Sequence, residues 1–305
     1  MVLSQEQRDK RRLGIGSSDV ACILGADQWK SDYELWLEKT GRAVMPEAGQ
    51  AAEIGNQLES YVLSLVEQEL LMPVLENPGT DEFTYTNGVL RANVDGMIGK
   101  FEKGSPIVEI KTTGLTQDWG SPMTDEIPFR VLCQVTHQMI ACDSDLCYVG
   151  CLKAERGFKF DIYKVHKDPD FANELKQKCE DWWKTHVVLD TAPPITRAVD
   201  DDVWSGVERI PLKSCSVSTE LLQSYIEARE KAKAAEQEMK EAKSSILAAM
   251  GDAEIAVSPG FSCSFKKQNR KSFDTSEFKK GHPELFQAFQ KTSTFRRFDV
   301  RELKQ

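Results

Sequence analysis

The sequence lacks the features that mark membrane and secreted proteins. No segment of its 305 residues approaches the ~20 consecutive apolar residues that span a bilayer. The first eight residues contain no apolar core, so we expect no secretory signal peptide. These absences predict a soluble protein of the cytoplasm that has no membrane partner.

Cysteine and histidine are too scattered to predict a metal centre. The eight cysteines include no C-x-x-C pair, and the four histidines lie far apart, so we expect reduced thiols and no zinc site. Cys142, Cys147 and Cys151 do cluster, as the ligands of an iron–sulfur centre would. However, Cys147 and Cys151 are four residues apart in a strand-like run, and this spacing on one face of a strand favours core thiols.

Charge is unevenly distributed. The net charge of −9 argues against a protein that coats DNA through bulk electrostatics. Residues 262–305 nevertheless contain 11 Lys and Arg against 5 Asp and Glu. Basic and aromatic residues alternate in this tail, which suits nucleic acid and equally a small core with solvated lysines. They are Lys266, Lys267, Arg270, Lys271, Arg296 and Arg297, with Phe265, Phe273, Phe295 and Phe298.

The chain divides into two predicted regions. Residues 1–200 mix helical and strand patterns and contain the chemically suggestive motifs, and they end in a proline-bearing stretch, Thr191–Ile195. Residues 200–215 are typical of a connector. We therefore expect one domain of residues 1–200 and a C-terminal extension of residues 201–305, which contains a long helix and the small basic tail.

The long helix is predicted for residues 218–250. Ser218 is suited to the N-cap, and Gly251 is suited to ending the helix. Its apolar residues alternate at spacings of four and three, which is typical of a coiled-coil seam. The partner of this seam can belong to the same chain or to another. The seam consists of Leu221, Tyr225, Ala228, Ala232, Ala235, Met239, Ala242, Ile246 and Ala249.

Two strand-like segments, Leu90–Gly99 and Pro106–Thr113, are rich in Val and Ile and predict an antiparallel hairpin. Side chains two residues apart share one face of a strand, so Glu109 and Lys111 are expected to point the same way. Asp95, in the neighbouring segment, can then lie beside Glu109.

This arrangement of two carboxylates and a lysine suits phosphodiester chemistry. Adjacent carboxylates repel each other unless a cation lies between them. Mg²⁺ prefers oxygen ligands and keeps waters for a substrate phosphate, and it lowers the pKa of a bound water. A neighbouring lysine would orient that water and stabilise charge on the phosphate. The pattern therefore predicts metal-dependent hydrolysis, although the same residues also occur on ordinary solvated strand faces.

Other segments hold candidate residues that also have a plain structural interpretation. Glu59 lies in a predicted helix that opens near Ala51, where it is available as a third carboxylate or as a surface residue. Gln134 and Gln138 share one face of a helix predicted to begin after Pro128. There an amide can reach a ligand or satisfy buried backbone.

A glycine-rich segment near the start is a candidate anion site. Arg11 and Arg12 precede Gly14 and Gly16, and Ser18 follows them just before an apolar helix. A helix N-terminus with hydroxyl groups and upstream arginines suits a phosphate, and it equally suits a simple N-cap. The segment is not a dinucleotide fingerprint, since no strand precedes it.

Taken in order, six motifs resemble the YqaJ-type viral recombinase family, the phage lambda exonuclease group of the PD-(D/E)XK nucleases. The resemblance covers residues 8–165, and the ordered set is specific although no single motif is decisive. The motifs are Arg11–Asp19, Tyr33–Gly41, Gly55–Glu59, Asn93–Gly96, Glu109–Lys111 and Gln134–Met139.

The resemblance implies an α/β fold with a PD-(D/E)XK nuclease core, in which helices flank a mixed central sheet. It implies that Asp95, Glu109 and the backbone carbonyl of Ile110 hold Mg²⁺, with Mn²⁺ able to substitute. In this family pattern Lys111 positions the attacking water, and Glu59 completes the acidic cluster.

The resemblance also implies a pocket for the end of a DNA strand. Gln134 would line the site near the substrate, and Arg11 or Arg12, with Ser18, would hold a 5′-phosphate. The chain departs from the family pattern at one point, because Asn93 replaces a serine that helps to hold this phosphate. Its amide can still donate a hydrogen bond, but the departure weakens the expectation that a 5′-phosphate is required.

Studied members of the family digest duplex DNA from the 5′ end, encircle it as ring-shaped trimers and work beside a single-strand annealing protein. The resemblance therefore implies a phage-type or prophage-encoded exonuclease that resects double-stranded DNA ends for recombination in a bacterial host. The alternatives are an endonuclease on the same core and a DNA-binding accessory protein that does not cut. The arginines beside Ser18 argue against the endonuclease, and the intact Asp95, Glu109 and Lys111 argue against the accessory protein.

Overall fold

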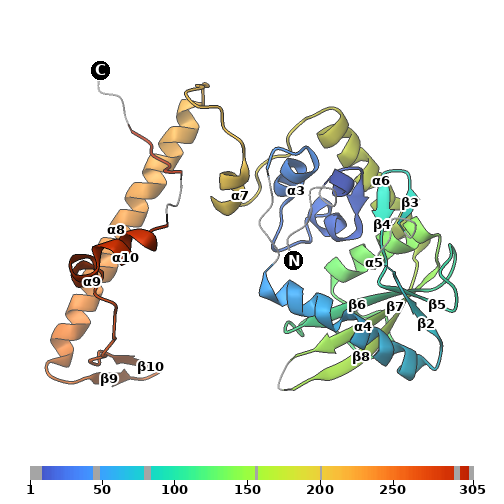
Figure 1. Cartoon of the computed structure of the whole chain (residues 1–305), viewed down its shortest axis with the longest axis horizontal. Coiled ribbons are helices and arrows are strands. Elements are labelled where there is room, and N and C mark those ends of the chain that lie inside the picture. Colours follow the sequence, from blue (N-terminus) through green and yellow to red (C-terminus); the bar gives the residue numbers. More distant parts are fainter. Residues whose placement is uncertain are drawn as a thin grey trace. The chain divides into compact units, whose positions relative to one another are not determined.

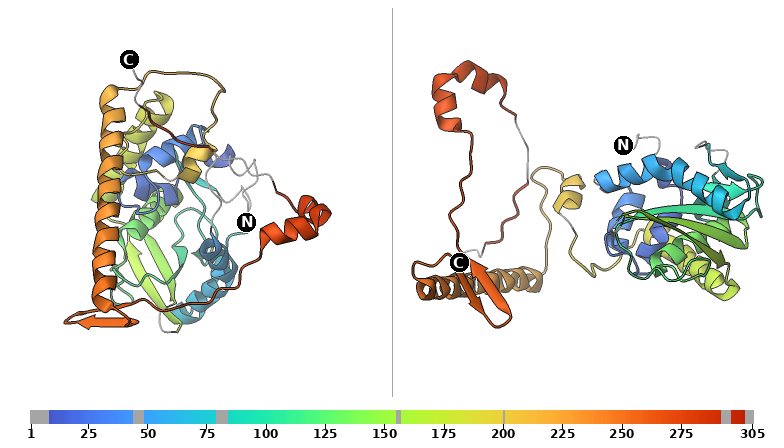
Figure 2. Two further views of the ribbon diagram at one scale, coloured as in Figure 1. Left: turned by 90° about the vertical axis from the view of Figure 1, so that its left-hand side faces the viewer. Right: turned by 90° about the horizontal axis from the view of Figure 1, so that it is seen from below.

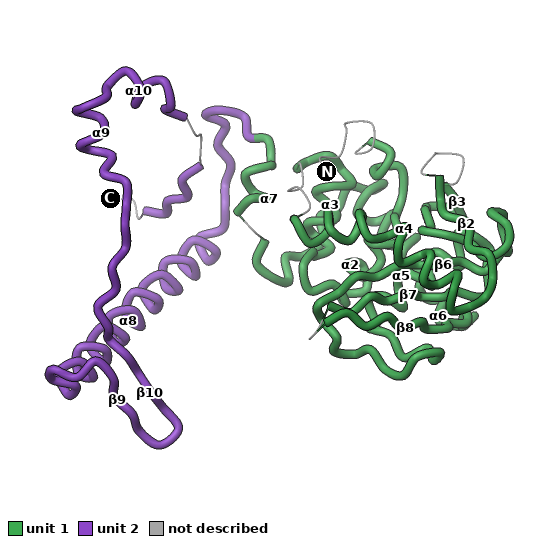
Figure 3. Tube along the Cα trace, turned by 60° about the horizontal axis from the view of Figure 1, so that its bottom comes forward, with its two compact units in different colours: residues 1–208 green, residues 209–305 purple. Residues whose placement is uncertain are grey.

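The computed structural model describes most of the chain as two compact units, Met1–Glu208 and Arg209–Gln305 (Figure 3). Phe295 of the predicted basic tail lies outside the described residues. The described residues are 9–43, 49–78, 84–154, 157–199, 201–291 and 296–301.

A five-stranded mixed sheet forms the centre of the first unit, in the order β2-β5-β6-β7-β8 (Figure 1). Strands β6 and β7 run parallel, and the other neighbouring pairs run antiparallel. The strands are β2 (Val74–Glu76), β5 (Gly96–Ile98), β6 (Ile107–Thr113), β7 (Leu146–Lys153) and β8 (Lys159–His166).

Helices cover both faces of this sheet (Figure 2). Helix α4 (Gln50–Leu70) packs its apolar side chains against Val108 and Ile110 of β6. Helix α5 (Phe129–Cys142) packs on the opposite face, against Ile107 and its neighbours. The expected fold class, a mixed sheet flanked by helices together with a long C-terminal helix, is confirmed.

A three-stranded sheet, β1-β4-β3, and several short helices enclose a second apolar core in the same unit. The beginning of the predicted connector also packs here. It forms a short helix, and Val203 of this helix is buried in the core. The elements are β1 (Ile15–Gly16), the 3-10 helix η1 (Ser17–Asp19), α2 (Val20–Ile23), α3 (Asp32–Lys39), β3 (Tyr85–Asn87), β4 (Leu90–Ala92), α6 (Pro169–Trp182), the π-helix η3 (Trp183–Val188) and α7 (Asp201–Gly206).

The segment expected to form one strand, residues 90–99, is divided between the two sheets. Its first part is β4, its last part is β5, and residues 93–95 connect them. The two parts bury their apolar side chains in different cores, Leu90 in one and Met97 in the other, which one straight strand could not do. The predicted antiparallel pairing with β6 is present, with Gly96 opposite Val108.

The second unit is built on the predicted long helix, α8 (Thr219–Met250). The side chain of Ser218 accepts a hydrogen bond from the N–H of Leu221, and Gly251 ends the helix at a φ of 59°. No helix in the described part of the chain is long and apolar enough to cross a membrane. The remaining elements are β9 (Ile255–Ser258), β10 (Phe261–Ser264), α9 (Thr275–Gly281) and α10 (Pro283–Ala288).

Candidate active site

Glu109, in the middle of β6, is the centre of a hydrogen-bonded cluster of polar side chains. Its side chain is buried. The Oε1 atom accepts from Lys111 Nζ at 2.5 Å and from Gln134 Nε2 at 2.5 Å, while Oε2 accepts from Gln138 Nε2 at 2.6 Å. Lys111 Nζ also donates to Gln134 Oε1 at 2.8 Å. The prediction that Glu109 and Lys111 share one face of the strand is confirmed.

Asp95 lies next to this cluster, at the end of the connection between the two sheets. Its Oδ2 accepts the backbone N–H of Ile110 at 2.7 Å. Burial raises the pKa of Asp95 well above its usual value, and the negative charges of Glu109 and Glu59 raise it further, against the opposing effects of Lys111 and the Ile110 N–H. The Asp95 carboxylate is therefore held among like charges in a poorly solvated place.

Glu59 projects from α4 and is half-buried. Burial raises its pKa, and the charges of Glu109 and Glu76 add to that effect, while Lys111 lowers it. Among the described residues, no three His, Cys, Asp or Glu side chains are arranged to hold a metal ion. Glu59 thus adds negative charge to the site, and donors occupy both oxygens of Glu109.

The residues present fit a hard divalent cation with few protein ligands. Asp95 and Glu109 supply carboxylate oxygens, which Mg²⁺ prefers, and their mutual repulsion would be offset by a cation. In the described structure Gln138 Oε1 is a buried atom with no hydrogen-bond partner. The amide that donates to Glu109 therefore keeps an unsatisfied acceptor.

A second polar cluster surrounds Asp19, the last residue of the first motif, for which the sequence predicts no role. Its buried carboxylate accepts the N–H of Gly16 at 2.8 Å and pairs with Lys39 Nζ at 2.6 Å and Lys30 Nζ at 3.9 Å. Burial alone would raise the pKa of Asp19, but the ammonium groups of Lys39 and Lys30 outweigh burial and hold it below its usual value. The three residues come from different elements, so no periodic spacing in the sequence connects them.

The two candidate arginines have different surroundings. Arg11 Nε pairs with Glu38 Oε1 at 3.2 Å, and the Arg11 charge helps to lower the pKa of Asp19. Arg12 pairs instead with the exposed Asp9, at 3.4 Å. Arg11 therefore belongs to the Asp19 cluster, whereas Arg12 has its ion pair outside it.

Ser18 and Asn93 are both exposed. Ser18 lies in η1 directly before Asp19, and Asn93 begins the connection that ends at Asp95. The structure thus brings Asp95, Glu109, Lys111, Gln134 and Glu59 to one place, and it puts Arg11 and Ser18 in the neighbourhood of Asp19. A hydrogen bond of 3.0 Å between His137 Nε2 of α5 and the Ile15 carbonyl links the two parts.

Gln138 shares a helix face with Gln134, but the sequence alone gives it no role in the site. It is the more deeply buried of the two, with 1% of its surface exposed, and it alone donates to Glu109 Oε2. The signal that could have identified it was the four-residue spacing from Gln134, which places both amides on one side of α5.

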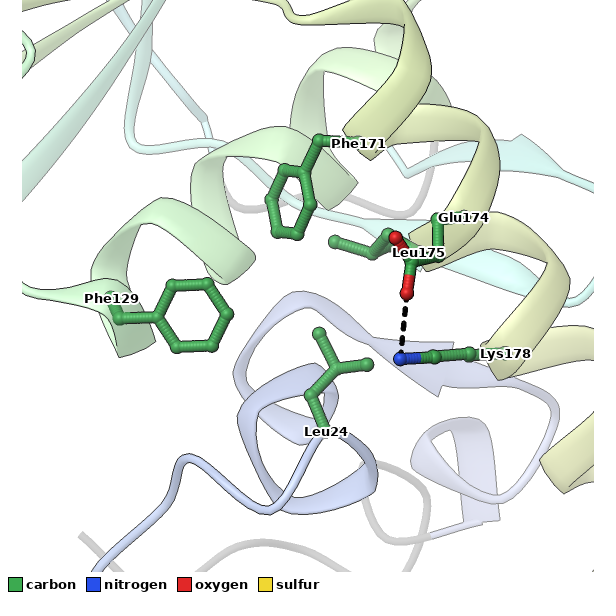
Figure 4. Close-up of a pocket in the computed structure, with 6 residues that line it drawn as sticks. All are labelled: Leu24, Phe129, Phe171, Glu174, Leu175 and Lys178. Atoms are coloured by element: carbon green, nitrogen blue, oxygen red, sulfur yellow. Dashed lines mark ion pairs between the residues drawn. The ribbon is translucent and has the colours of Figure 1, made fainter.

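A small cavity of about 220 Å³ lies elsewhere in the first unit (Figure 4). Its lining is mostly apolar, with one ion pair between Glu174 and Lys178 at 2.8 Å. None of the predicted site residues lines it, so it is separate from the Glu109 cluster. The lining residues are Leu24, Phe129, Phe171, Glu174, Leu175 and Lys178.

Residues 7–145 match the YqaJ-like viral recombinase domain, and this stretch contains every predicted site residue. Over nearly its whole length the chain is similar to the uncharacterized protein YqaJ of Bacillus subtilis (strain 168). The two are 27% identical over 315 residues, which cover 98% of this chain and 96% of that protein.

Two solved structures are also similar to part of this chain. One is the alkaline exonuclease LHK-Exo from Laribacter hongkongensis in complex with dAMP, at 18% identity and a TM-score of 0.46, covering 59% of this chain and 92% of that one. The other is a phage-related exonuclease from Haemophilus somnus 129PT, at 12% identity and a TM-score of 0.43, covering 60% of this chain and 99% of that one.

Proposed function

We propose that this protein is a metal-dependent deoxyribonuclease whose active site is formed by Asp95, Glu109 and Lys111. The observation that carries the proposal is the Glu109 cluster, in which a lysine is held at 2.5 Å from a buried carboxylate and a second carboxylate lies nearby among like charges. The match to a viral recombinase domain supports a nuclease that acts in recombination.

Each residue has a distinct role in this proposal. Asp95, Glu109 and the Ile110 carbonyl would hold Mg²⁺ or Mn²⁺, which when bound supplies Lewis acidity and a water of lowered pKa. Lys111, fixed between Glu109 and Gln134, orients the attacking water and stabilises charge on the scissile phosphate. Glu59 adds to the negative potential that retains a cation.

The finer proposal is a 5′→3′ exonuclease that resects linear double-stranded DNA. It rests on the family resemblance and on a candidate 5′-phosphate pocket formed by Arg11, Ser18 and Asn93. Arg11 is preferred to Arg12 because it belongs to the Asp19 cluster. The proposed setting is the cytoplasm of a bacterial host, with a ring of three copies and a single-strand annealing protein as partners, and with the basic tail adding DNA contacts.

The test uses linear duplex DNA labelled at either end, with and without a 5′-phosphate, in Mg²⁺ and in EDTA. We expect the 5′ label to be released before the 3′ label in Mg²⁺, and neither label to be released in EDTA. Cleavage of closed circular DNA would indicate an endonuclease. Binding without cleavage in Mg²⁺ and in Mn²⁺ would overturn the proposal and leave an accessory role.

A further inference from the structure

Helix α8 carries a row of apolar side chains that its own unit leaves largely exposed. The exposed fractions are 64% for Leu221, 42% for Tyr225, 66% for Met239 and 50% for Ile246. Most of the stability of a helix in water comes from packing its apolar face rather than from helix propensity. A helix of 32 residues with this face open is therefore built to receive a partner.

Among the described residues, the contacts between α8 and the rest of its unit lie towards the two ends of the helix. Near the start, Phe298 meets the ring of Tyr225 edge-on at 5.1 Å, and the carbonyl of Val300 accepts from Arg229. Near the end, the sulfur atom of Met250 lies 3.7 Å from the sulfur atom of Cys263. Between these contacts, residues 231–242 are exposed throughout.

The seam is complementary to itself when two copies of α8 run antiparallel. Tyr225 and Met239 then each face an alanine of the other helix, so that in these layers a large side chain is matched by a small one. In a parallel pair each seam residue would face the same residue of the other helix. The two Met239 side chains would then share one layer, and the layers on either side of it would contain alanine side chains. The antiparallel layers are Leu221 against Ile246, Tyr225 against Ala242, Ala228 against Met239, and Ala232 against Ala235.

The charges beside the seam agree with the same register. Arg229 comes opposite Glu236 of the second copy, and Lys231 comes opposite Glu238, with each pair formed twice because of the two-fold symmetry. Sliding the helices by seven residues in either direction brings Glu236 opposite Glu236 or Lys231 opposite Lys231. Exposed ion pairs contribute little stability, so these charges select the register while the apolar layers hold the helices together.

Charge by itself does not choose the orientation, because a parallel pair also brings Lys231 near Glu236. The alternation of large and small residues does choose it. We infer that α8 binds α8 of a second copy of this chain in antiparallel orientation, with its seam residues forming the interface. This inference is independent of the proposed nuclease activity.

The first test measures the mass of the full-length protein in solution at tens of micromolar by light scattering. Ala235→Glu puts a charge at the centre of the seam, and Ser244→Glu puts the same charge on the opposite face of the helix as a matched control. The mass is expected to halve in Ala235→Glu and to stay unchanged in Ser244→Glu. A wild-type mass of one copy, or a mass that Ala235→Glu leaves unchanged, overturns the inference.

The second test fixes the orientation and does not require a disrupted variant. Ala228→Cys and Met239→Cys are made separately, in a background in which the exposed Cys215 and the half-exposed Cys263 are replaced by serine. The two proteins are mixed under reducing conditions and then oxidised. A disulfide-linked pair that contains one copy of each variant, and no such pair from either variant alone, is expected. Cross-linking of Ala228→Cys with itself, or no cross-link in the mixture, overturns the antiparallel arrangement.

A charge exchange gives a third measurement. Glu236→Arg is expected to lower the dimer affinity because it meets Arg229 of the second copy, and Arg229→Glu in the same chain is expected to restore the affinity. Restoration by Lys231→Glu instead would indicate the parallel pair.

Discussion

The Nε2 atom of Gln138 lies 2.6 Å from Oε2 of Glu109, on the opposite side of the carboxylate from Lys111. This amide holds the Glu109 carboxylate from the helix side, while the lysine holds it from the strand. The orientation of Glu109 is thereby set by α5 as well as by its own strand.

Replacing Gln138 with leucine is therefore expected to reduce DNA cleavage about 10–100-fold, since residues that orient a metal ligand have effects of this size. The Mg²⁺ concentration that gives half-maximal rate is expected to rise as well. Gln177→Leu on α6, whose exposed side chain donates to Asp181, is the control. Rates within twofold of the wild type would show that Gln138 has no positioning role.

Asp95→Asn and Glu109→Gln are each expected to lower the Mg²⁺-dependent rate about 1,000-fold or more, because several kcal/mol of charge stabilisation at the phosphate depend on the metal. The Asp95→Asn protein is expected to keep its thermal unfolding midpoint. Asparagine can still accept the Ile110 N–H, and its neutral amide removes the repulsion from Glu109 and Glu59. Normal cleavage by Asp95→Asn would mean that the active site has been assigned wrongly.

Lys111→Ala is expected to slow the reaction about 100–1,000-fold, as removal of one preorganised donor does in other hydrolases. Because Lys111 is not a metal ligand in the proposal, the Mg²⁺ concentration for half-maximal rate is expected to change much less than the rate. Steady-state kinetics over a Mg²⁺ titration separate the two quantities. Lys100→Ala, an exposed lysine in the β5–β6 hairpin, serves as the control.

The buried ring of His137 makes stability depend on pH. Burial lowers its pKa from 6.5 to about 4, and its Nδ1 is buried without a partner in the described structure. The unfolded chain takes up this proton below about pH 6.5, whereas the folded protein does so only near pH 4. The free energy of unfolding is thus expected to fall by about 3 kcal/mol as the pH drops across this window.

His137→Gln isolates this contribution, because glutamine can still donate to the Ile15 carbonyl and does not titrate. Chemical denaturation at pH 7 and pH 4.5 is the measurement, and the variant is expected to lose less stability between these values than the wild type. Equal losses in the two proteins would assign the pH dependence to other groups.

The pair of Asp19 and Lys39 is expected to be a large contributor to the stability of the first unit. Both side chains are almost fully buried, so Lys39→Met leaves the carboxylate with the Gly16 N–H and the more distant ammonium group of Lys30. Loss of one member of a buried pair costs about 3–5 kcal/mol. Asp19→Asn with Lys39→Met in the same chain is expected to recover part of this loss, and denaturant unfolding of the three variants measures it.

Local patterns predicted the parts of the site that depend on one element. The period of two along β6 placed Glu109 and Lys111 on one face, and the spacing of four along α5 placed Gln134 beside Gln138. The break at residues 93–95 could not be predicted in this way, because its cause is the presence of two separate cores. The pairing of Asp19 with Lys39 joins two elements whose relative positions are fixed only by tertiary packing.

The long helix could be predicted from the sequence, because its caps and its seam depend on neighbouring residues of one segment. Its bounds were predicted to within one residue. What covers the seam was left open by the sequence. Within its own unit the seam is exposed except where Phe298 packs against Tyr225, and that exposure is what makes an intermolecular partner testable.

The hydrogen bond from the Ile110 amide to Asp95 has a practical consequence. This N–H ends on a titratable carboxylate and not on a carbonyl of a neighbouring strand, so its proton chemical shift and its rate of deuterium uptake should respond to whatever charge Asp95 carries. In an isotope-labelled sample, the backbone signal of Ile110 would then report both cation binding at the site and protonation of Asp95, without DNA being present.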